Sequence, residues 1–545
     1  MAFATSMNSR HSHSLVLTSA LALGLVACSA DVESRQVAPT GPAIQKPLPG
    51  APTPQPPTGL VVNWGACDIP SGDVLYPAEC ASVDMPARRD VAGSGTVSVA
   101  VYRLKSPKQP AAGQLWMLNG GPGGSGAELA PYGDIIARTF AQGLDIYLVD
   151  HRGTGESSFM DCPVAMSTAE SMKEFGKLCS AETRVELGDK ADGFSTTESA
   201  HDVRELIDAV VRPDQKVFVY GVSYGSYWAH RLLQLPGVKV DAVVTEGNCL
   251  SSTCSFNKPQ TFAMDEVMKT VLDACKEDVE CTEHLGNDPW QFAKDTLALL
   301  ANGHCSEAKF TEYPPADMMF AMGPIWAPGT LPILYRLNRC NANDVVALNR
   351  VEKKLVEVSP FGMHAGPRLT PAWGATPKPD AAKMTSPILG MHVIASEMVS
   401  RPAPTKAQLD AQLGSLIFKA NTDLEYDAYD SWQVYPRNEY VDTWMKRDVP
   451  WLVLQGDFDF QTVYSLTQEA LKHVQDPSLQ FVRVDSGNHS VVFGDDTCPR
   501  DIMQAFLANP TAKVDASCVA GLKAKATKLD PDYVKYFFGS GTGWD

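Results

Sequence analysis

The segment "VFVYGVSYGSYWAH", residues 217–230, places a glycine-flanked serine between a short apolar run and a longer segment with an apolar face. The apolar run is typical of a buried strand, and the longer segment predicts a helix. A serine at such a turn, in the pattern Gly221-x-Ser223-x-Gly225, is typical of a nucleophile whose hydroxyl projects from the edge of a sheet. The two glycines avoid side chains that would collide with the neighbouring strand and helix. A chance serine in an ordinary tight turn is the alternative.

Strand-like and helix-like segments alternate on both sides of this turn. Short apolar runs bounded by turn residues are typical of buried strands, whereas residues 195–211 begin with a helix-capping serine and repeat apolar residues at helical spacing. The expected strands are 96–104, 114–118, 145–150, 216–220, 241–246, 449–456 and 479–485. This alternation predicts an α/β fold, with a mostly parallel sheet and helices on both faces.

The alternation breaks between residues 250 and 440, where probable strands are few and helices such as 261–275 and 290–301 lie among loops rich in proline and glycine. Because the strand–helix pattern then resumes, we expect residues 250–440 to form a mainly helical cap inserted before the last strands. Open α/β sheets bind their ligands at the carboxyl edge of the strands, where such a cap would lie. The core then consists of residues 60–249 and 441–545.

A nucleophilic serine needs a general base, and the base needs an orienting acid. In folds with this turn, the acid follows the serine in the chain and the histidine comes last. His489 follows the last expected strand, and Asp459 follows the strand before it, so both lie at the edge that carries Ser223. Asp457 competes for the role of the acid. An exposed loop position for His489 and a helix N-cap role for Asp459 are the alternatives.

The segment "LNGGPGGSG", residues 118–126, follows another expected strand. Acyl transfer needs backbone N–H groups that point at the oxyanion of the tetrahedral intermediate, and glycines let the backbone approach closely. We expect the N–H groups of Gly121 and of Tyr224, the residue after the serine, to form this oxyanion hole. A merely flexible loop is the alternative.

Five motifs together resemble those of α/β-hydrolase serine peptidases of the prolyl aminopeptidase and tripeptidyl aminopeptidase type, and the second group more closely. They are the glycine-rich segment 120–126, the D-x-R-G-x-G-x-S segment 150–157, the elbow 221–227, the G-x-x-D-x-x-T segment 456–462 and the G-x-H segment 487–489. The resemblance implies the α/β-hydrolase fold and a serine peptidase.

The resemblance extends over about residues 62–250 and 445–500 and hardly reaches the expected cap. It favours Asp459 over Asp457 as the acid. It also implies an acyl-enzyme on Ser223, a short peptide substrate cut near its free N-terminus, and no cofactor or metal.

Two residues depart from the family pattern. Asn119 stands where prolyl aminopeptidases carry histidine and the tripeptidyl group usually carries proline, and Phe460 replaces the usual proline after the acid. Both departures leave the substrate preference open. An aminopeptidase also needs an acidic group for the substrate ammonium, for which Glu246 and Glu397 are candidates that the sequence does not separate.

Two other classes of function use the same fold. A lipoprotein esterase or lipase would carry the same triad, because the chemistry at the elbow does not separate amides from esters. A non-catalytic binding protein is the second class, and the complete set of serine, aspartate and histidine argues against it. Epoxide hydrolases and dehalogenases would carry aspartate at position 223, which Ser223 disfavours.

The N-terminus predicts export. Residues 15–27 form an uncharged run of 13 residues, which is too short to span a bilayer and fits a secretory signal. The run ends at Cys28 in a pattern that resembles the bacterial lipoprotein box, so we expect residues 1–27 to be removed and Cys28 to be acylated. A plain signal peptide with a chance cysteine is the alternative. The proline-rich residues 28–59 would form a disordered tether that holds the enzyme off a bacterial cell membrane or outer membrane.

Charge and cysteine usage agree with this location. The net charge is −17 and basic residues form no run, which argues against nucleic-acid binding. Of the 13 cysteines, 12 remain when Cys28 is set aside, and none has zinc-site spacing. We expect six disulfides formed in an oxidising compartment. The sequence does not fix their connectivity, and pairing of nearest neighbours is a guess.

Overall fold

The computed structural model describes most of the chain after the N-terminal segment. The described residues are 59–545 apart from 72–73, 141–142, 256–259, 313–321, 324–325, 358–384, 415, 419–428, 447, 495, 524–525 and 540. The predicted signal sequence, Cys28 and nearly all of the tether lie outside the described residues, so they stay predictions.

The described residues form one nine-stranded sheet in the order β1-β2-β3-β5-β4-β6-β7-β8-β9. The strands are β1 Gly65–Ser71, β2 Val74–Pro86, β3 Thr96–Leu104, β4 Gly113–Leu118, β5 Leu144–Val149, β6 Lys216–Val222, β7 Ala242–Glu246, β8 Trp451–Gly456 and β9 Leu479–Val484. Pairing is antiparallel from β1 through β3 to β5 and parallel across the rest. The seven strands expected from the sequence are therefore confirmed. The hairpin of β1 and β2 was not expected, because its prolines and half-exposed residues obscure a strand pattern.

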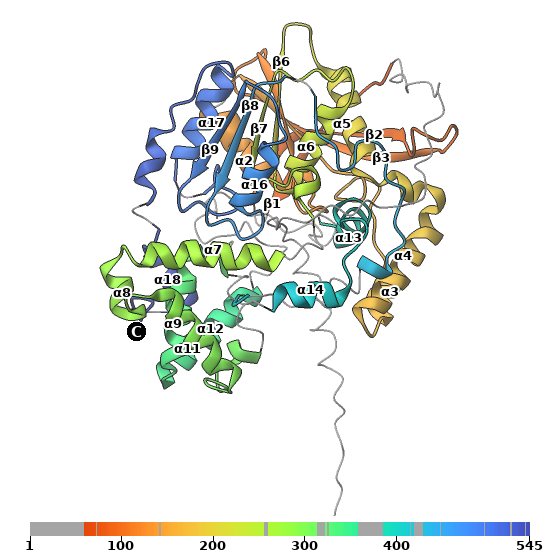
Figure 1. Cartoon of the computed structure of the whole chain (residues 1–545). Helices are drawn as coiled ribbons and strands as arrows, with labels where there is room; N and C mark the ends of the chain where they lie inside the picture. Colours follow the sequence, from red (N-terminus) through yellow and green to blue (C-terminus); the bar gives the residue numbers. More distant parts are fainter. Residues whose placement is uncertain are drawn as a thin grey trace, which may run out of the picture.

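Side chains alternate between the two faces of the sheet and feed two hydrophobic clusters. Along β4, Trp116 and Leu118 belong to one cluster, whereas Leu115 and Met117 belong to the other. The first face is covered by α5 (Thr196–Val210) and α6 (Tyr224–Gln234), and the second by α2 (Ala130–Ile135) and α17 (Cys498–Ala508). Helices thus cover both faces of a mostly parallel sheet, as the sequence predicts (Figure 1).

Most cap helices lie below the carboxyl edge of the sheet in Figure 1. They are α7 Gln260–Cys275, α8 Val279–Leu285, α9 Pro289–Ala301, α11 Thr330–Arg339, α12 Ala342–Glu357, α13 Pro387–Val393 and α14 Lys406–Leu413. The first hydrophobic cluster continues from the sheet into this region and includes Leu331, Leu334 and Leu337 of α11. The cap and the sheet therefore share one apolar core.

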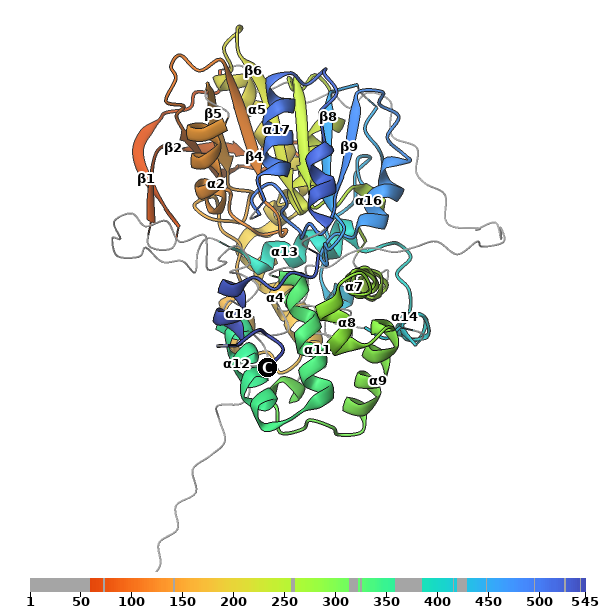
Figure 2. The same ribbon diagram turned by 90° about the vertical axis from the view of Figure 1, so that its left-hand side faces the viewer.

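The last residues of the chain lie against the cap, although the sequence analysis assigns residues 441–545 to the core. Helix α18 (Pro531–Phe537) lies beside α11 and α12 (Figure 2). Arg336 donates a hydrogen bond to the carbonyl of Gly543 at 2.7 Å, and Arg339 donates to the carbonyl of Trp544 at 2.9 Å. These buried contacts hold the C-terminal residues on α11.

Six disulfides join nearest neighbours in the sequence, which confirms both the expected number and the guessed pairing. The pairs are Cys67–Cys80, Cys162–Cys179, Cys249–Cys254, Cys275–Cys281, Cys305–Cys340 and Cys498–Cys518. Short closed loops of this kind restrain the unfolded chain locally.

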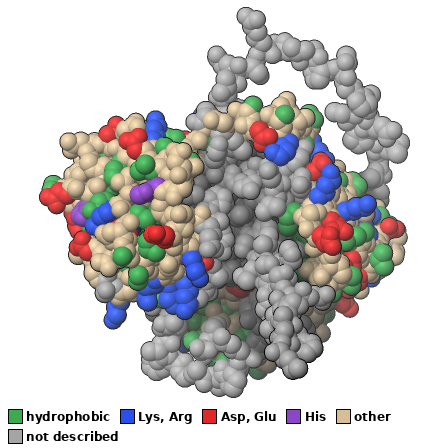
Figure 3. Space-filling model, turned by 90° about the horizontal axis from the view of Figure 1, so that it is seen from below, with side chains coloured by type: hydrophobic (Ala, Val, Ile, Leu, Met, Phe, Trp, Pro, Cys, Tyr) green, Lys and Arg blue, Asp and Glu red, His purple; other side chains and the backbone are tan. Residues whose placement is uncertain are grey.

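The described surface is mixed in charge. Seen from below, acidic and basic side chains are interspersed on the described parts of this face (Figure 3). In the part of the chain that the structure describes, no helix has both the length and the apolar character to cross a bilayer.

Candidate active site

Ser223 occupies the sharp turn between β6 and α6. Its backbone has φ 57° and ψ −130°, a region that costs a non-glycine residue free energy and is found mainly at functional sites. A Cβ atom at Gly221 would lie 2.4 Å from the carbonyl oxygen of Gly225, and one at Gly225 would lie 2.0 Å from that of Leu118. Neither position has room for a side chain, which is why glycine flanks this serine.

The glycine-rich loop after β4 lies directly against the nucleophile. A Cβ atom at Gly120 would lie 2.7 Å from Cβ of Ser223 and 3.2 Å from its Oγ. Gly121 follows with φ 113°, in the region that favours glycine, and Tyr224 begins α6. The two residues expected to form the oxyanion hole thus flank Ser223, one on the loop and one on the helix.

Buried hydrogen bonds hold this loop in shape. The side-chain amide of Asn119 donates to the carbonyl of Ser125 at 2.7 Å, and its oxygen accepts the N–H of Gly120 at 2.7 Å. The hydroxyl of Ser125 donates to Asp150, which also accepts the hydroxyl of Tyr102 at 2.7 Å. Burial raises the pKa of Asp150, against these donors. Asn119, which departs from the family pattern, therefore spans the base of the loop.

His489 and Asp459 form a buried pair. Nδ1 of His489 lies 2.9 Å from Oδ2 and 3.0 Å from Oδ1 of Asp459. The carboxylate also accepts the N–H groups of Gln461 and Thr462 at 2.8 Å and the hydroxyl of Thr462 at 2.7 Å. With Nδ1–H donated to the carboxylate, the neutral imidazole has Nε2 free to accept a proton.

Asp457 serves a different purpose. Its carboxylate pairs with the guanidinium of Arg483 at 2.6 Å and accepts the N–H of Ser486 at 2.6 Å. The structure therefore places Asp459, rather than Asp457, beside His489.

The end of β7 contacts both the serine turn and the histidine. The N–H of Ser223 donates to the carbonyl of Glu246 at 3.0 Å. A Cβ atom at Gly247, the next residue, would lie 2.8 Å from Cε1 and 2.9 Å from Nδ1 of His489. The role of Gly247 was missed in the sequence analysis, although a glycine directly after a buried strand was a usable signal.

The acid is also anchored by residues that the sequence analysis missed. The side-chain amide of Gln455, in β8, donates to Oδ2 of Asp459 at 3.0 Å. The side-chain oxygen of Gln455 accepts the N–H of Asn248 at 2.9 Å. The second bond connects the segment after β7 to β8 below the candidate triad, and no local motif marks it.

Both acidic candidates for the substrate ammonium are buried and already paired. Glu397 forms an ion pair with Arg231 at 3.0 Å and accepts the hydroxyl of Tyr435 at 2.7 Å. Burial raises the pKa of Glu397, but the Arg231 guanidinium and the hydrogen bonds to the carboxylate together outweigh burial, so the pKa lies below its ordinary value. Glu246 accepts hydrogen bonds from Tyr220 and from the backbone of Val492. Neither carboxyl group is an open anion at the sheet edge.

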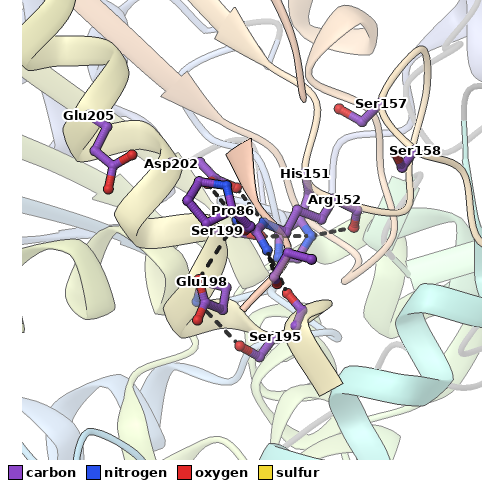
Figure 4. Close-up of polar contacts among 12 residues, drawn as sticks. Pro86, His151, Arg152, Ser157, Ser158, Ser195, Glu198, Ser199, Asp202 and Glu205 are labelled. Carbon is purple, nitrogen blue, oxygen red and sulfur yellow. Dashed lines mark hydrogen bonds and ion pairs between the residues drawn. The ribbon is translucent and has the colours of Figure 1, made fainter. Parts of the chain in front are cut away.

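The D-x-R-G segment forms a buried scaffold (Figure 4). The guanidinium of Arg152 binds Asp202 of α5 through Nε at 2.5 Å and Nη2 at 2.7 Å, and Nη2 also donates to the carbonyl of Pro86 at 2.8 Å. Burial lowers the pKa of His151 to about 4, and its Nε2 lies 3.1 Å from the hydroxyl of Tyr224. The segment thus supports the residue that follows the nucleophile.

Over the described ranges, no group of three or more His, Cys, Asp or Glu side chains is arranged to share a metal ion.

Two family models match the chain and divide the site between them. The alpha/beta hydrolase fold model matches residues 115–284, which include the glycine-rich loop and Ser223. The model described as TAP-like protein matches residues 418–518, which include Asp459 and His489. The chain has the α/β-hydrolase fold, as the sheet order and these matches show. Its C-terminal part is TAP-like, which supports a hydrolase.

The solved structures that resemble this chain are distant. A proline iminopeptidase from Mycobacterium smegmatis is 14% identical with a TM-score of 0.35, and the match covers 82% of this chain and 99% of that one. An esterase from Exiguobacterium antarcticum is 11% identical with a TM-score of 0.30, covering 76% and 96%. These likenesses do not separate peptidases from esterases. Among curated proteins, none matches this sequence.

Proposed function

We propose that this protein is an exported serine aminopeptidase. It would release di- or tripeptides, or proline-related residues, from the free N-terminus of peptides through an acyl-enzyme. The observation that carries the proposal is the buried His489–Asp459 pair at 2.9 Å, linked through the end of β7 to a serine in a φ-positive elbow, in a chain whose C-terminal part matches a TAP-like model.

The proposed mechanism assigns one step to each of these groups. The hydroxyl of Ser223 attacks the substrate carbonyl while Nε2 of His489 takes its proton, and Asp459 stabilises the imidazolium. The N–H groups of Gly121 and Tyr224 bind the oxyanion. His489 then gives the proton to the leaving amine. Water, activated by the same histidine, releases the acyl group from Ser223.

The seating of the cap supports a substrate of limited size. The N–H of Ser386 donates to the carbonyl of Gly123 at 2.9 Å, and a Cβ atom at Gly390 would lie 2.6 Å from the carbonyl oxygen of Pro122. Helix α13 of the cap therefore rests on the glycine-rich loop that flanks Ser223. A cap in this position would exclude folded proteins and favour short, extended chains.

The test is a matched series of mono-, di- and tripeptidyl chromogenic amides, each with a free and an acetylated N-terminus, beside a p-nitrophenyl ester. Ser223→Ala protein is the control for background hydrolysis. Losing the charge-assisted contact of the ammonium costs roughly 1.5–3 kcal/mol, or about tenfold to 150-fold in kcat/KM. We expect free di- or tripeptidyl amides to be cut and acetylated ones to be cut slower by that factor. Equal rates for both forms would overturn the aminopeptidase proposal, and ester turnover alone would indicate an esterase.

We also propose a lipid anchor at Cys28. Six disulfides support an oxidising compartment, and an acyl-anchored chain needs no spanning helix. Palmitate labelling in a bacterial host should depend on Cys28. A Cys28→Ser protein that is processed and membrane-bound like the wild type would contradict the anchor.

A further inference from the structure

Glu246 is the last residue of β7, between the strand that leads to the serine and the strand that leads to the acid. It pairs in register with Val222 of β6 and Leu454 of β8 and is fully buried. Its main-chain oxygen accepts the N–H of Ser223 at 3.0 Å. The backbone of Glu246 thus fixes the height of the nucleophile turn above the sheet.

The side chain of the same residue reaches the loop that carries the histidine. Its Oε2 accepts the N–H of Val492, three residues after His489, at 2.8 Å. Its Oε1 accepts the hydroxyl of Tyr220, in β6. One residue therefore binds both the Ser223 turn and the His489 loop.

The two residues that follow extend the same connection. Gly247 lies against the imidazole of His489, and Asn248 reaches Asp459 through Gln455. A buried carboxyl is costly unless it is hydrogen-bonded, and an apolar residue here would leave the N–H of Val492 and the hydroxyl of Tyr220 unpaired. The chain therefore keeps a carboxyl where packing alone would favour an apolar side chain.

We propose that Glu246 is a positioning residue that holds the imidazole of His489 in line with Ser223 and, when ionised, favours the imidazolium. The inference rests on the proposed triad. It gives Glu246 a role in addition to that of Asp459, because Asp459 orients the ring from Nδ1, whereas Glu246 fixes the loop and the turn relative to each other.

The charge of Glu246 gives the proposal a pH signature. Burial raises its pKa to about 7, against hydrogen bonds from Tyr220 and Val492 and the charge of His489. The titratable groups that face it are Tyr220 from β6, Tyr132 from α2 and His489. The charges of Glu246 and His489 attract each other, so a variant without the carboxylate should stabilise the imidazolium less.

The experiment compares Glu246→Gln, which keeps an acceptor but has no charge, with Glu246→Leu, which has neither. Glu469→Gln, on the exposed surface of α16 (Tyr464–Leu471), is the matched control. We expect Glu246→Gln to keep kcat within about tenfold at pH 8, with the acid limb of kcat/KM moved by about half a pH unit or more to lower pH. Glu246→Leu should lose at least about 100-fold in kcat with little change in KM.

A second readout separates the inference from the proposed function. The rate at which a fluorophosphonate labels Ser223 depends on the base but not on the peptide substrate. Wild-type protein without labelling or turnover would defeat the proposed function itself. The positioning role alone would be overturned if the wild-type protein is labelled but the acid limb is unchanged in Glu246→Gln. The same holds if the wild-type protein is labelled but folded Glu246→Leu keeps the wild-type kcat. Where Glu246→Leu does not fold, the pH profile of Glu246→Gln decides.

Discussion

The carboxyl edge of the sheet and the cap are held together in different ways. At the edge, backbones approach closely. A methyl group at Gly225 would overlap its neighbour by more than an ångström, and one at Gly247 would lie within 3 Å of His489. In the cap, apolar side chains such as Leu331 and Leu337 fill a cluster that continues from one face of the sheet. The edge is therefore sensitive to added atoms, and the cap is sensitive to lost volume.

This difference separates chemistry from stability. Hydrogen bonds and close backbone contacts at the edge fix the positions of the reacting groups, and a misplacement of about 1 Å can cost about 100-fold in rate. Packing in the cap contributes to the free energy of folding, but it tolerates many substitutions of one apolar residue by another. Variants at the edge should thus lose activity while they remain folded, whereas variants in the cap should lose stability first.

The largest effect is expected from the nucleophile and the base. Ser223→Ala and His489→Ala should each lower kcat by about 10⁴–10⁶-fold, because members of a triad act as a unit. Both proteins should keep a melting temperature near that of the wild type. The measurement is amide turnover together with thermal unfolding. Near-wild-type turnover by folded Ser223→Ala protein would contradict the proposed mechanism.

Two neighbouring aspartates provide the next comparison. Asp459→Asn should lower kcat by about 10⁴-fold, because an amide no longer selects the required tautomer of His489. Asp457→Asn weakens an ion pair with the half-exposed Arg483 and should cost only about 1 kcal/mol of stability, with activity largely kept. Kinetics and unfolding of both variants decide, and the reverse order of activity losses would move the acid to Asp457.

Adding one methyl group to the edge tests its close approach. Gly120→Ala would place a Cβ atom 2.7 Å from Cβ of Ser223, so we expect kcat to fall by about 10²–10³-fold as the loop or the serine shifts. Gly521→Ala is the matched control, since no atom lies within 4 Å of its added Cβ. Similar activity in the two variants would show that the loop adapts and that the edge is not rigid.

The last comparison concerns the joint stability of cap and sheet. Burial lowers the pKa to about 3 for His201 and His230 and to about 4 for His151 and, in the cap, His392. These folded-state values lie below the unfolded value of about 6.5, so the stability they contribute is present above pH 6.5 and lost as the pH falls toward 4 and 3. Each fully buried histidine accounts for on the order of 3 kcal/mol at the end of that range.

Because the cap and the sheet share one hydrophobic cluster, acid should unfold them together. Tryptophan fluorescence and far-UV circular dichroism, followed from pH 7 to pH 3, should change with one midpoint. Two separated transitions would show that the cap unfolds independently of the sheet and would contradict a shared core.

The contrast between the two regions also explains what could be predicted from the sequence. Only glycine fits where two backbones approach closely, so the elbow at Ser223 and the loop at Gly121 leave patterns within a few residues. Asp459 and His489 are marked just as locally, by their positions directly after strands. The seven predicted strands follow from equally local apolar runs. Their shared edge follows from the parallel order alone.

Long-range partners left no such pattern. The bond from Asn248 to Gln455 and the paired state of Glu246 and Glu397 depend on segments far apart in the chain. The hold of Arg336 on the last residues, 207 positions away at Gly543, likewise has no local signature. From the sequence alone, a buried and paired carboxyl looks the same as one that is free to bind a ligand. Only the structure shows which donors surround it.

The central claim, that Ser223 is a nucleophile activated by His489, is tested most directly by covalent labelling. Intact-mass measurement after treatment with a fluorophosphonate should show one added group, and peptide mapping should place it on Ser223. Ser223→Ala protein should remain unlabelled, and His489→Ala should be labelled at least about 100-fold more slowly. Labelling at another residue, or equal labelling of Ser223→Ala protein, would contradict the account.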